Sequence, residues 1–487
     1  MKKYYLLVLS FLLIFSITIF ISCSKDNEEP IYAPIIDNLP VATDDVVNST
    51  LESTIEIPVL NNDKSGDAIL ANSVGLINGT DTDNNGTLDQ LIVVNQGTWN
   101  VNPVSGAITF NSKSNFLGNP IKISYTVKDA QNNVSNQANV TINAMPITVV
   151  NIDSEPLQKL SEYKFFIGVM KNQNPALNVT PYEPASSLFT DYAKKKRFVW
   201  MPANTKATYN GDYKVLELPV GSVLIKTFYY DNVQPDNVTK ILETRLMIRK
   251  STGWIFAEYV WNESQTEAFL DLSGSTKPIS WKDENNVVKN ANYKIPNQAQ
   301  CNACHKTTPG GLVSYIPIGI KPQNLNTNHT YSLETKNQLT KWIELGNLNA
   351  NFNLPSPENS TVNYKDVTKS LDQRARSYVD INCAHCHQVD QLCYYRPMRF
   401  AYSQTGLTDG VGQTNMGVCV NTQDVQGLPL SNYPKIVKAQ SINESMLYYR
   451  LNTTDETYRM PLHGRTIIHT EGVELMKQWI NSLSACR

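Results

Sequence analysis

Two short motifs of the same pattern carry the chemistry that this sequence indicates most strongly. Residues 301–305 read CNACH and residues 383–387 read CAHCH, so both follow the pattern C-x-x-C-H. On a helical turn, this spacing lets two thiols reach the two vinyl groups of one haem, and the adjacent histidine meets the iron. The sequence therefore predicts two covalently bound c-type haems. Their attachment residues are Cys301, Cys304, Cys383 and Cys386, and their iron ligands are His305 and His387.

Two other uses of paired cysteines stay open at this point. Four thiolates with histidine could form a zinc site, although 78 positions separate His305 from Cys383 and a histidine directly after the second cysteine is not the usual zinc spacing. A thioredoxin-like redox pair would lie near a βαβ pattern, and neither motif does. The pattern favours haem over both alternatives.

The second iron ligand of haem 2, the haem of the motif at 383–387, is expected to be Met460. Residues 459–464 read RMPLHG and precede a helical pattern, which resembles the methionine loop of class I cytochromes c. A thioether ligand raises the reduction potential of the iron. Met398, Met416 and Met446 compete for this role. His385, inside the second motif, is expected to face solvent or a haem propionate.

Haem 1, at residues 301–305, has a different set of candidate ligands. No methionine occurs between His305 and Cys383, and His329 is the only histidine in that stretch. Three possibilities remain open: His329 binds the iron, the iron is five-coordinate, or a ligand comes from another domain.

The composition restricts the class of protein. The chain has 487 residues, which predicts about three domains. Its net charge of −2 leaves no basic excess to neutralise phosphates, so nucleic acid is excluded as an expected partner. Eight cysteines are too few for a disulfide scaffold of this size. We expect a bridge between Cys393 and Cys419, with Cys486 free.

The N-terminus has the pattern of a secretory signal. Lys2 and Lys3 precede an apolar run over 4–21, and Ser22-Cys23 precedes an acidic, polar stretch. This predicts a lipoprotein signal peptide over 1–22, lipidation of Cys23 and a tether over 23–40. The alternative is an uncleaved membrane anchor. The chain is therefore expected to be lipid-anchored to a bacterial outer membrane and to face the periplasm or the cell surface.

Short β-branched runs separated by Asn, Asp and Gly clusters predict a β-sandwich over 41–145. Residues 102–110 and 124–130 resemble bacterial Ig-like or cadherin-like repeats. Within this domain, Asp81, Asp83, Asn85 and Asp89 stand at positions 1, 3, 5 and 9 of a calcium-type loop, with glycine at position 6. Position 12 is Ile92 rather than glutamate. An Asx-rich turn without calcium is the alternative.

The remainder of the chain is expected to change from strands to helices. Residues 150–296 read as a β-rich domain, 297–352 as the first haem segment, and 363–487 as a cytochrome c domain with the second haem. Helical spacing occurs over 332–345, 371–382 and 470–483. The predicted fold class is multidomain: an Ig-like sandwich, a middle β-rich domain and one or more C-terminal all-α cytochrome c-type haem domains.

Several stretches besides the motifs resemble a largely uncharacterised family of secreted two-haem c-type cytochromes. The resemblance covers residues 155–487. It rests on residues 181–182, 188–193, 243–245, 259–261, 295–300, 317–319, 325–326 and 337–339. It implies haem content and redox work but supplies no substrate.

The expected function is electron transfer outside the cytoplasm by a dihaem c-type cytochrome lipoprotein, with an unknown redox partner protein. A haem oxidoreductase, peroxidase-like or oxidising a small molecule, is the first alternative; in it, haem 1 is open and haem 2 relays electrons. The second alternative is a surface binding or adhesion protein with auxiliary haems.

Overall fold

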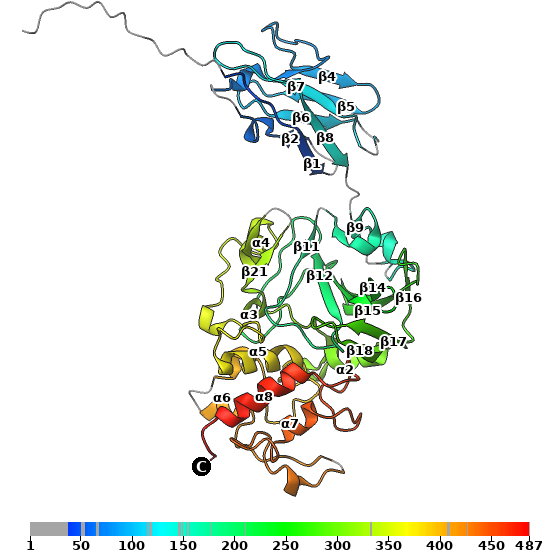
Figure 1. The fold of residues 1–487 in the computed structure, drawn as a ribbon, viewed down its shortest axis with the longest axis vertical. Helices are drawn as coiled ribbons and strands as arrows, with labels where there is room; N and C mark the ends of the chain where they lie inside the picture. The colour runs from blue at the N-terminus through cyan, green and yellow to red at the C-terminus, as the bar shows by residue number, and fades with distance from the viewer. Residues whose placement is uncertain are drawn as a thin grey trace, which may run out of the picture. The chain divides into compact units, whose positions relative to one another are not determined.

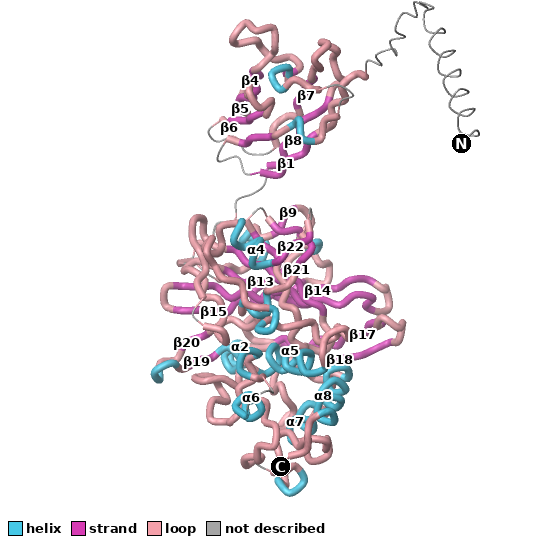
Figure 2. The backbone as a smooth tube through the Cα atoms, turned by 90° about the vertical axis from the view of Figure 1, so that its left-hand side faces the viewer, coloured by secondary structure: helices cyan, strands magenta, loops and turns pink. Residues whose placement is uncertain are grey.

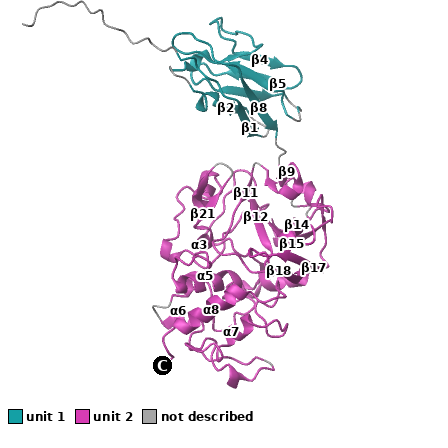
Figure 3. Cartoon of the chain, in the orientation of Figure 1, with its two compact units in different colours: residues 1–144 teal, residues 145–487 magenta. Residues whose placement is uncertain are grey.

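The computed structural model describes residues 38–486, except residues 50–53, 65–67, 114–115, 117–118, 145–147, 149, 152, 155, 177, 210, 332–333, 407–409 and 426 (Figure 1). The signal peptide over 1–22 and the lipidation site Cys23 lie outside the described residues. None of the helices in the described part is long and apolar enough to cross a membrane. The chain divides into two compact units, residues 1–144 and 145–487 (Figure 3).

Unit 1 consists of two four-stranded sheets that share one core. The first sheet has the order β1 (Asp45–Ser49), β8 (Ala138–Ala144), β7 (Ile123–Thr126) and β3 (Gly75–Leu76). The second has the order β2 (Ile55–Ile57), β6 (Ile108–Ser112), β5 (Gly97–Val101) and β4 (Gln90–Val93). Alternate residues of both sheets are buried, among them Trp99, Phe110 and Tyr125. This alternation holds two sheets face to face, as in a sandwich.

Unit 2 is built on one large antiparallel sheet. Its order is β11 (Val179–Pro181), β12 (Lys194–Trp200), β13 (Val223–Val233), β14 (Val238–Lys250), β15 (Gly253–Trp261) and β16 (Ala268–Leu270). The hairpin of β17 (Ser275–Lys282) and β18 (Val288–Ile295) joins it through β13. Three two-stranded pairs complete the unit: β9 (Phe166–Ile167) with β10 (Asn174–Pro175), β19 (Lys306–Thr307) with β20 (Ser314–Tyr315), and β21 (Asn328–Thr330) with β22 (Thr335–Asn337).

Both faces of this sheet are covered. One face carries Phe198, Ile225 and Leu246 in an apolar core. On the other face, Leu224 and Met247 share a core with Leu325 of α3 (Pro322–Leu325) and Trp342 of α4 (Gln338–Glu344). Because side chains alternate along a strand, the register of the sheet decides which residues face the helices.

The remaining helices are α2 (Gln298–His305), α5 (Leu371–Cys383), α6 (Gly410–Asn415), α7 (Met446–Leu451) and α8 (Thr470–Ser482) (Figure 2). The longest, α5 and α8, pack against each other through Val379, Met476 and Trp479. Their contact is close at Gly472, where an added Cβ would lie 2.3 Å from the Oη atom of Tyr378. The predicted helices over 371–382 and 470–483 are therefore confirmed, while α4 starts at Gln338 after the cap residue Asn337, later than predicted.

The predicted fold class is wrong in its C-terminal part. The structure is mostly β, with 30% strand against 19% helix and seven short helices among the described residues, and it contains no C-terminal all-α haem domain. Most of residues 384–469 are loops and turns. Residues 427–434 read GLPLSNYP, and proline and glycine prevent helix formation there. Unit 2 holds the predicted parts 150–296, 297–352 and 363–487 in one compact body.

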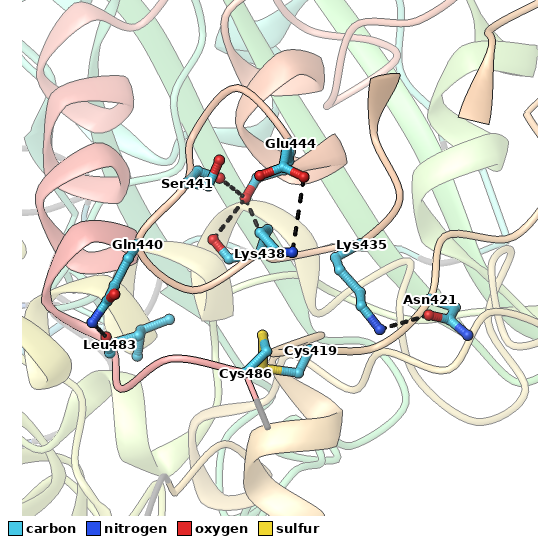
Figure 4. The surroundings of a disulfide bond; sticks show 10 residues. Cys419, Asn421, Lys435, Lys438, Gln440, Ser441, Glu444, Leu483 and Cys486 are labelled. Carbon is cyan, nitrogen blue, oxygen red and sulfur yellow. Dashed lines mark hydrogen bonds and ion pairs between the residues drawn. A yellow bond between two sulfur atoms is a disulfide. The ribbon is translucent and has the colours of Figure 1, made fainter. Parts of the chain in front are cut away.

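The predicted disulfide is also wrong. Cys419 is bonded to Cys486, with the Cα atoms 5.5 Å apart, and Cys393 is a free, buried thiol. Figure 4 shows the bond beside the end of α8, where Gln440 donates to the backbone oxygen of Leu483 at 3.1 Å. The end of α8 brings Cys486 to Cys419 across 67 positions. Sequence spacing alone favoured the nearer partner.

Candidate haem attachment site

The first motif is formed by the short helix α2. The side chain of Asn297 caps this helix by accepting a hydrogen bond from the backbone N–H of Gln300 at 3.0 Å. The side chain of Gln300 in turn accepts a hydrogen bond from the backbone N–H of Asn297 at 3.1 Å. This reciprocal cap starts the helix, so the motif residues occupy its last turns. Cys301, Cys304 and His305 are half-buried. The helical turn that covalent haem attachment requires is therefore present.

The second motif begins at the last residue of α5. Ser370 and Gln373 cap the other end of this helix reciprocally. After Cys383, the backbone N–H groups of Cys386 and His387 both donate to the carbonyl of Cys383 at 3.1 Å. The chain thus continues in a tight turn, and Cys383 and His387 are buried. The second motif thus follows a helix of 13 residues and packs on an apolar core, whereas the first motif ends a helix of eight residues.

The imidazole of His305 is oriented by the backbone. Its Nδ1 lies 2.7 Å from the carbonyl oxygen of Ile316, and its ring centroid lies 5.1 Å from that of Phe256. A hydrogen bond from Nδ1–H to a carbonyl leaves the lone pair on Nε2, which is the arrangement found in most metal-binding histidines. Burial lowers the pKa of His305 to about 4, so the ring is neutral at pH 7. These features fit an iron ligand.

His387 lies in a more enclosed environment. Its ring packs edge-on against Phe400 at a centroid distance of 5.3 Å. Its Nδ1 is buried and has no hydrogen-bond partner among the described residues. Burial, with the nearby His385, lowers the pKa of His387 to about 3. A buried nitrogen without a partner costs about 1–3 kcal/mol. Among the described residues, the Nδ1 atom of His387 therefore has no counterpart to the backbone hydrogen bond that orients His305.

The two motifs are neighbours in space. The thiol of Cys304 is hydrogen-bonded to that of Cys386, a contact that lowers the pKa of Cys304 and raises that of Cys386. The chains that follow the motifs also meet, because the N–H of Thr308 donates to the carbonyl of Asp390 at 2.7 Å. His385 hydrogen-bonds with Cys304 rather than facing solvent alone. Residues 82 positions apart in the sequence therefore form one site.

A buried ion pair joins the segment after the first motif to the helix α5, which leads into the second motif. Lys321, which follows the first motif, pairs with Asp380 on α5, and the side-chain amide of Asn324 donates to the same carboxylate at 3.0 Å. A cavity of about 640 Å³ is lined by this ion pair, by Ile316 from the segment after the first motif, and by His385 of the second motif. The site thus has both a rigid link and free volume.

The zinc alternative gains no support from this geometry. In the part of the chain that the structure describes, no group of three or more His, Cys, Asp or Glu side chains is arranged to hold a metal ion. A haem is held differently, by two thioether bonds and one imidazole per motif, and each motif supplies those groups.

Met460 stays a prediction as the second ligand of haem 2. It is half-buried, and its backbone is fixed by Arg450, whose carbonyl accepts from its N–H at 2.8 Å, and by Arg465, which donates to its carbonyl at 3.1 Å. Met416 is fully buried in the same core as Cys383. Met416 therefore stays an alternative ligand of haem 2.

His329 does not join the site around His305. It lies on β21 with its ring 4.8 Å from that of Tyr331. It lines a different cavity, of about 1260 Å³, together with Tyr364 and His469. The structure thus gives no support to His329 as a ligand of haem 1.

The calcium-type loop in unit 1 uses its carboxylates within its own turn. Asp81 accepts from the N–H of Gly86 at 2.8 Å, Asp83 accepts from Asn85 at 2.9 Å, and Asp89 accepts from the Thr82 hydroxyl at 2.7 Å. This is the arrangement of an Asx-rich turn. Calcium binding by Asp81, Asp83, Asn85 and Asp89 stays a prediction.

The comparisons with known proteins identify no relative: no protein-family model matches the chain, and no curated protein is significantly similar to it. The resemblance to two-haem cytochromes therefore stays a prediction.

The sequence reasoning missed one group of residues near the first motif. Arg197, Lys226 and Arg245 lie side by side on β12, β13 and β14. The basic run KKKR over 194–197 and the single lysine within the run VLIKTF over 223–228 were visible in the sequence. Which residues face each other, however, depends on strand register.

Proposed function

We propose that this chain is a dihaem c-type cytochrome that transfers electrons outside the cytoplasm, anchored by a lipid on Cys23. The observation that carries the proposal is the contact between the two C-x-x-C-H motifs through Cys304 and Cys386. Haems attached at neighbouring sulfurs are themselves neighbours. Electrons can then pass from one to the other without a separate carrier.

The residues of the chain have distinct roles in this function. Cys301, Cys304, Cys383 and Cys386 would hold the haems covalently, and His305 and His387 would bind the irons. The bond from His305 to the Ile316 carbonyl fixes the ring and its tautomer. The apolar core around Cys383 excludes water from the second motif. A bound haem supplies a metal that cycles between the ferric and ferrous states.

Rigidity supports the same conclusion. The ion pair between Lys321 and Asp380 holds the segment after the first motif against α5. A site with little structural change between redox states exchanges electrons with a small reorganisation cost. Buried charge pairs that are satisfied by further hydrogen bonds, as Asp380 is by Asn324, keep such a geometry fixed.

An oxidoreductase with an open haem 1 is the second candidate. The observation that favours it is the position of His329, which lines a cavity other than the one beside the motifs. The iron at His305 is then without an assigned second protein ligand. Ready binding of carbon monoxide or cyanide to haem 1 would identify this function.

The first test is the haem content of the mature protein. Mass spectrometry should find two covalent haems in the wild type and one in each of the double variants Cys301→Ala/Cys304→Ala and Cys383→Ala/Cys386→Ala. Cys393→Ala is the matched control, because Cys393 is a buried free thiol outside the motifs, and it should keep both haems. A wild type with one haem or none contradicts the proposal.

The second test measures the interaction between the haems. In electron paramagnetic resonance, neighbouring ferric haems broaden each other's signals. We expect the wild-type spectrum to differ from the sum of the spectra of the two single-haem variants. A wild-type spectrum equal to that sum would mean that the haems are far apart and that electron exchange between them is not the function of this site.

A further inference from the structure

Three basic residues lie in one row across the large sheet of unit 2. In the strand register, Arg197 is opposite Lys226, and Lys226 is opposite Arg245. Directly paired residues on adjacent strands point to the same face of the sheet. Lys195 is two residues from Arg197 on β12 and shares that face. We call Lys195, Arg197, Lys226 and Arg245 the basic row.

Like charges placed directly opposite each other on a sheet are destabilising. Some of this charge is balanced: Arg245 pairs with the fully buried Glu243, and Arg197 lies 3.9 Å from Glu183, which is largely exposed. No ion pair occurs for Lys195 or Lys226 among the described residues. Two half-buried ammonium groups therefore lack an anionic partner.

The nearest remaining carboxyl does not supply one. Glu258 is opposite Arg245 and is buried. Burial and the neighbouring Glu243 raise the pKa of Glu258 far above its usual range, so this group is protonated at neutral pH. The titratable and charged groups that act on the two lysines are Arg197, Arg245, Glu243, Glu183 and Asp191. With Lys195 and Lys226 included, four cationic groups face three carboxylates, and burial together with the neighbouring cations lowers the pKa of both lysines well below its usual range in the absence of a further anion.

The basic row is adjacent to the first motif. Phe256 contacts the ring of His305. It lies two residues before Glu258 on β15, so the two side chains share a face of the sheet, and Glu258 is paired with Arg245 of the basic row. Cys301 packs on the core formed by Met247 and Phe256. Lys226 is also one of the charges that lower the pKa of His305. An anion bound by the row would therefore lie beside haem 1.

We propose that the basic row binds the two propionate carboxylates of haem 1, an inference that rests on the proposed dihaem function. A haem carries two carboxylates, and the row has two ammonium groups that contact the ring of Phe228 but have no anionic partner among the described residues. Charge-assisted hydrogen bonds from Lys and Arg to a carboxylate are short and about twice as strong as neutral ones. The guanidinium of Arg197 is buried and has one nitrogen without a hydrogen-bond partner.

The test is the pH dependence of the haem 1 reduction potential. In the wild type, the basic row keeps the propionates ionised, so the potential should be constant between pH 5 and pH 8. In Lys226→Met, a propionate loses its partner and takes up a proton in this range. Reduced haem holds the proton more tightly, so the potential should fall as the pH rises, by up to a tenfold change in the redox equilibrium per pH unit.

Two matched variants control this experiment. Lys196→Met changes an exposed lysine of the same strand whose side chain points to the opposite face, and it should behave as the wild type. Lys226→Arg keeps the charge and should restore the constant potential. If Lys226→Met does not accumulate, Lys195→Met is titrated in the same way.

The outcomes separate this inference from the proposed function. Two haems by mass together with an unchanged pH profile in both Lys226→Met and Lys195→Met would overturn the inference and leave the dihaem function intact. A wild type without haem would overturn the function. A free oxyanion is the other possible occupant: if inorganic phosphate shifts the haem 1 potential in the wild type but not in Lys226→Met, the row binds free anions and the propionate assignment is wrong.

Discussion

The two C-x-x-C-H motifs share a sequence pattern but differ in the elements that they pack against, which we call their supports. The first ends a helix of eight residues and lies against a sheet face that carries Arg197, Lys226 and Arg245. The second ends a helix of 13 residues whose buried face packs on α8. The first motif lies beside a row of basic residues on the sheet, and the second ends a helix whose buried face belongs to an apolar core. The difference teaches that the same motif can lie in two unlike environments, so that under the proposed function the surrounding elements would give the two haems different charge environments.

The largest expected effect concerns the ligand of haem 2. Met460→Ala should remove a thioether ligand, lower the reduction potential of one haem and abolish the weak near-infrared methionine-to-iron band. Redox titration and absorption spectroscopy measure both changes. If the band survives in Met460→Ala and disappears in Met416→Ala, the buried Met416 is the ligand instead.

The apolar support of the second motif is tested by Trp479→Ala. Trp479 is 1% exposed and fills the contact of α8 with α5. Its truncation should reduce the free energy of unfolding by about 4 kcal/mol, measured by denaturant titration. In the same titration, the absorption of haem 2 should change at a lower denaturant concentration than that of haem 1. Gln478→Ala is the control, because that neighbour is exposed. Equal loss at both haems would show that the two supports are not independent.

The link between the two supports is tested by Asp380→Asn. The substitution leaves the ammonium of Lys321 buried without its charge partner. Breaking a buried pair in this way costs about 3 kcal/mol, so the unfolding midpoint should fall. Lys321→Met combined with Asp380→Asn should recover part of the loss. A single variant as stable as the wild type would contradict the role of this pair.

The last effect concerns Glu258, in the charged surroundings of the first motif, and it grows with pH. The pKa of Glu258 is raised in the folded state, so folding takes up a proton, and the stability from this group is lost as the pH rises above the unfolded value near 4.5. Glu258→Gln needs no proton. Its stability should exceed that of the wild type by an amount that grows by up to about 1.4 kcal/mol per pH unit. Unfolding at pH 5, 7 and 9 measures this, and a constant difference contradicts it.

The helices of the site were largely predictable from the sequence, because their signals are local. The Ser370 and Gln373 capping pair and the spacing of apolar residues define α5 within a few positions. The contact between Cys304 and Cys386 was not predictable, because it joins segments that only the complete fold brings together. The same holds for the partner of Cys419 and for the pairing of Arg197 with Lys226, which both depend on tertiary geometry.

The expectation of an all-α haem domain failed for a related reason. The two helices around the second motif were recognised, but residues 384–469 between them were assumed to follow a known family pattern. The long β17–β18 hairpin over 275–295 was missed as well, since residues 283–289 mix charged and polar side chains without a clear alternation. Polar loops and edge strands carry weak local signals.

The contact between Cys304 and Cys386 has a consequence for how the protein is assembled. In the folded chain, Cys383 is buried and Cys304 is engaged with the other motif. If haem is attached as proposed, the attachment has to happen while the exported chain is still open. The maturation machinery must also keep these thiols reduced until then, because a bridge between the two motifs would block both. Under the proposed function, the positions of the sulfur atoms in the fold would therefore require the cofactor to be attached before folding is complete.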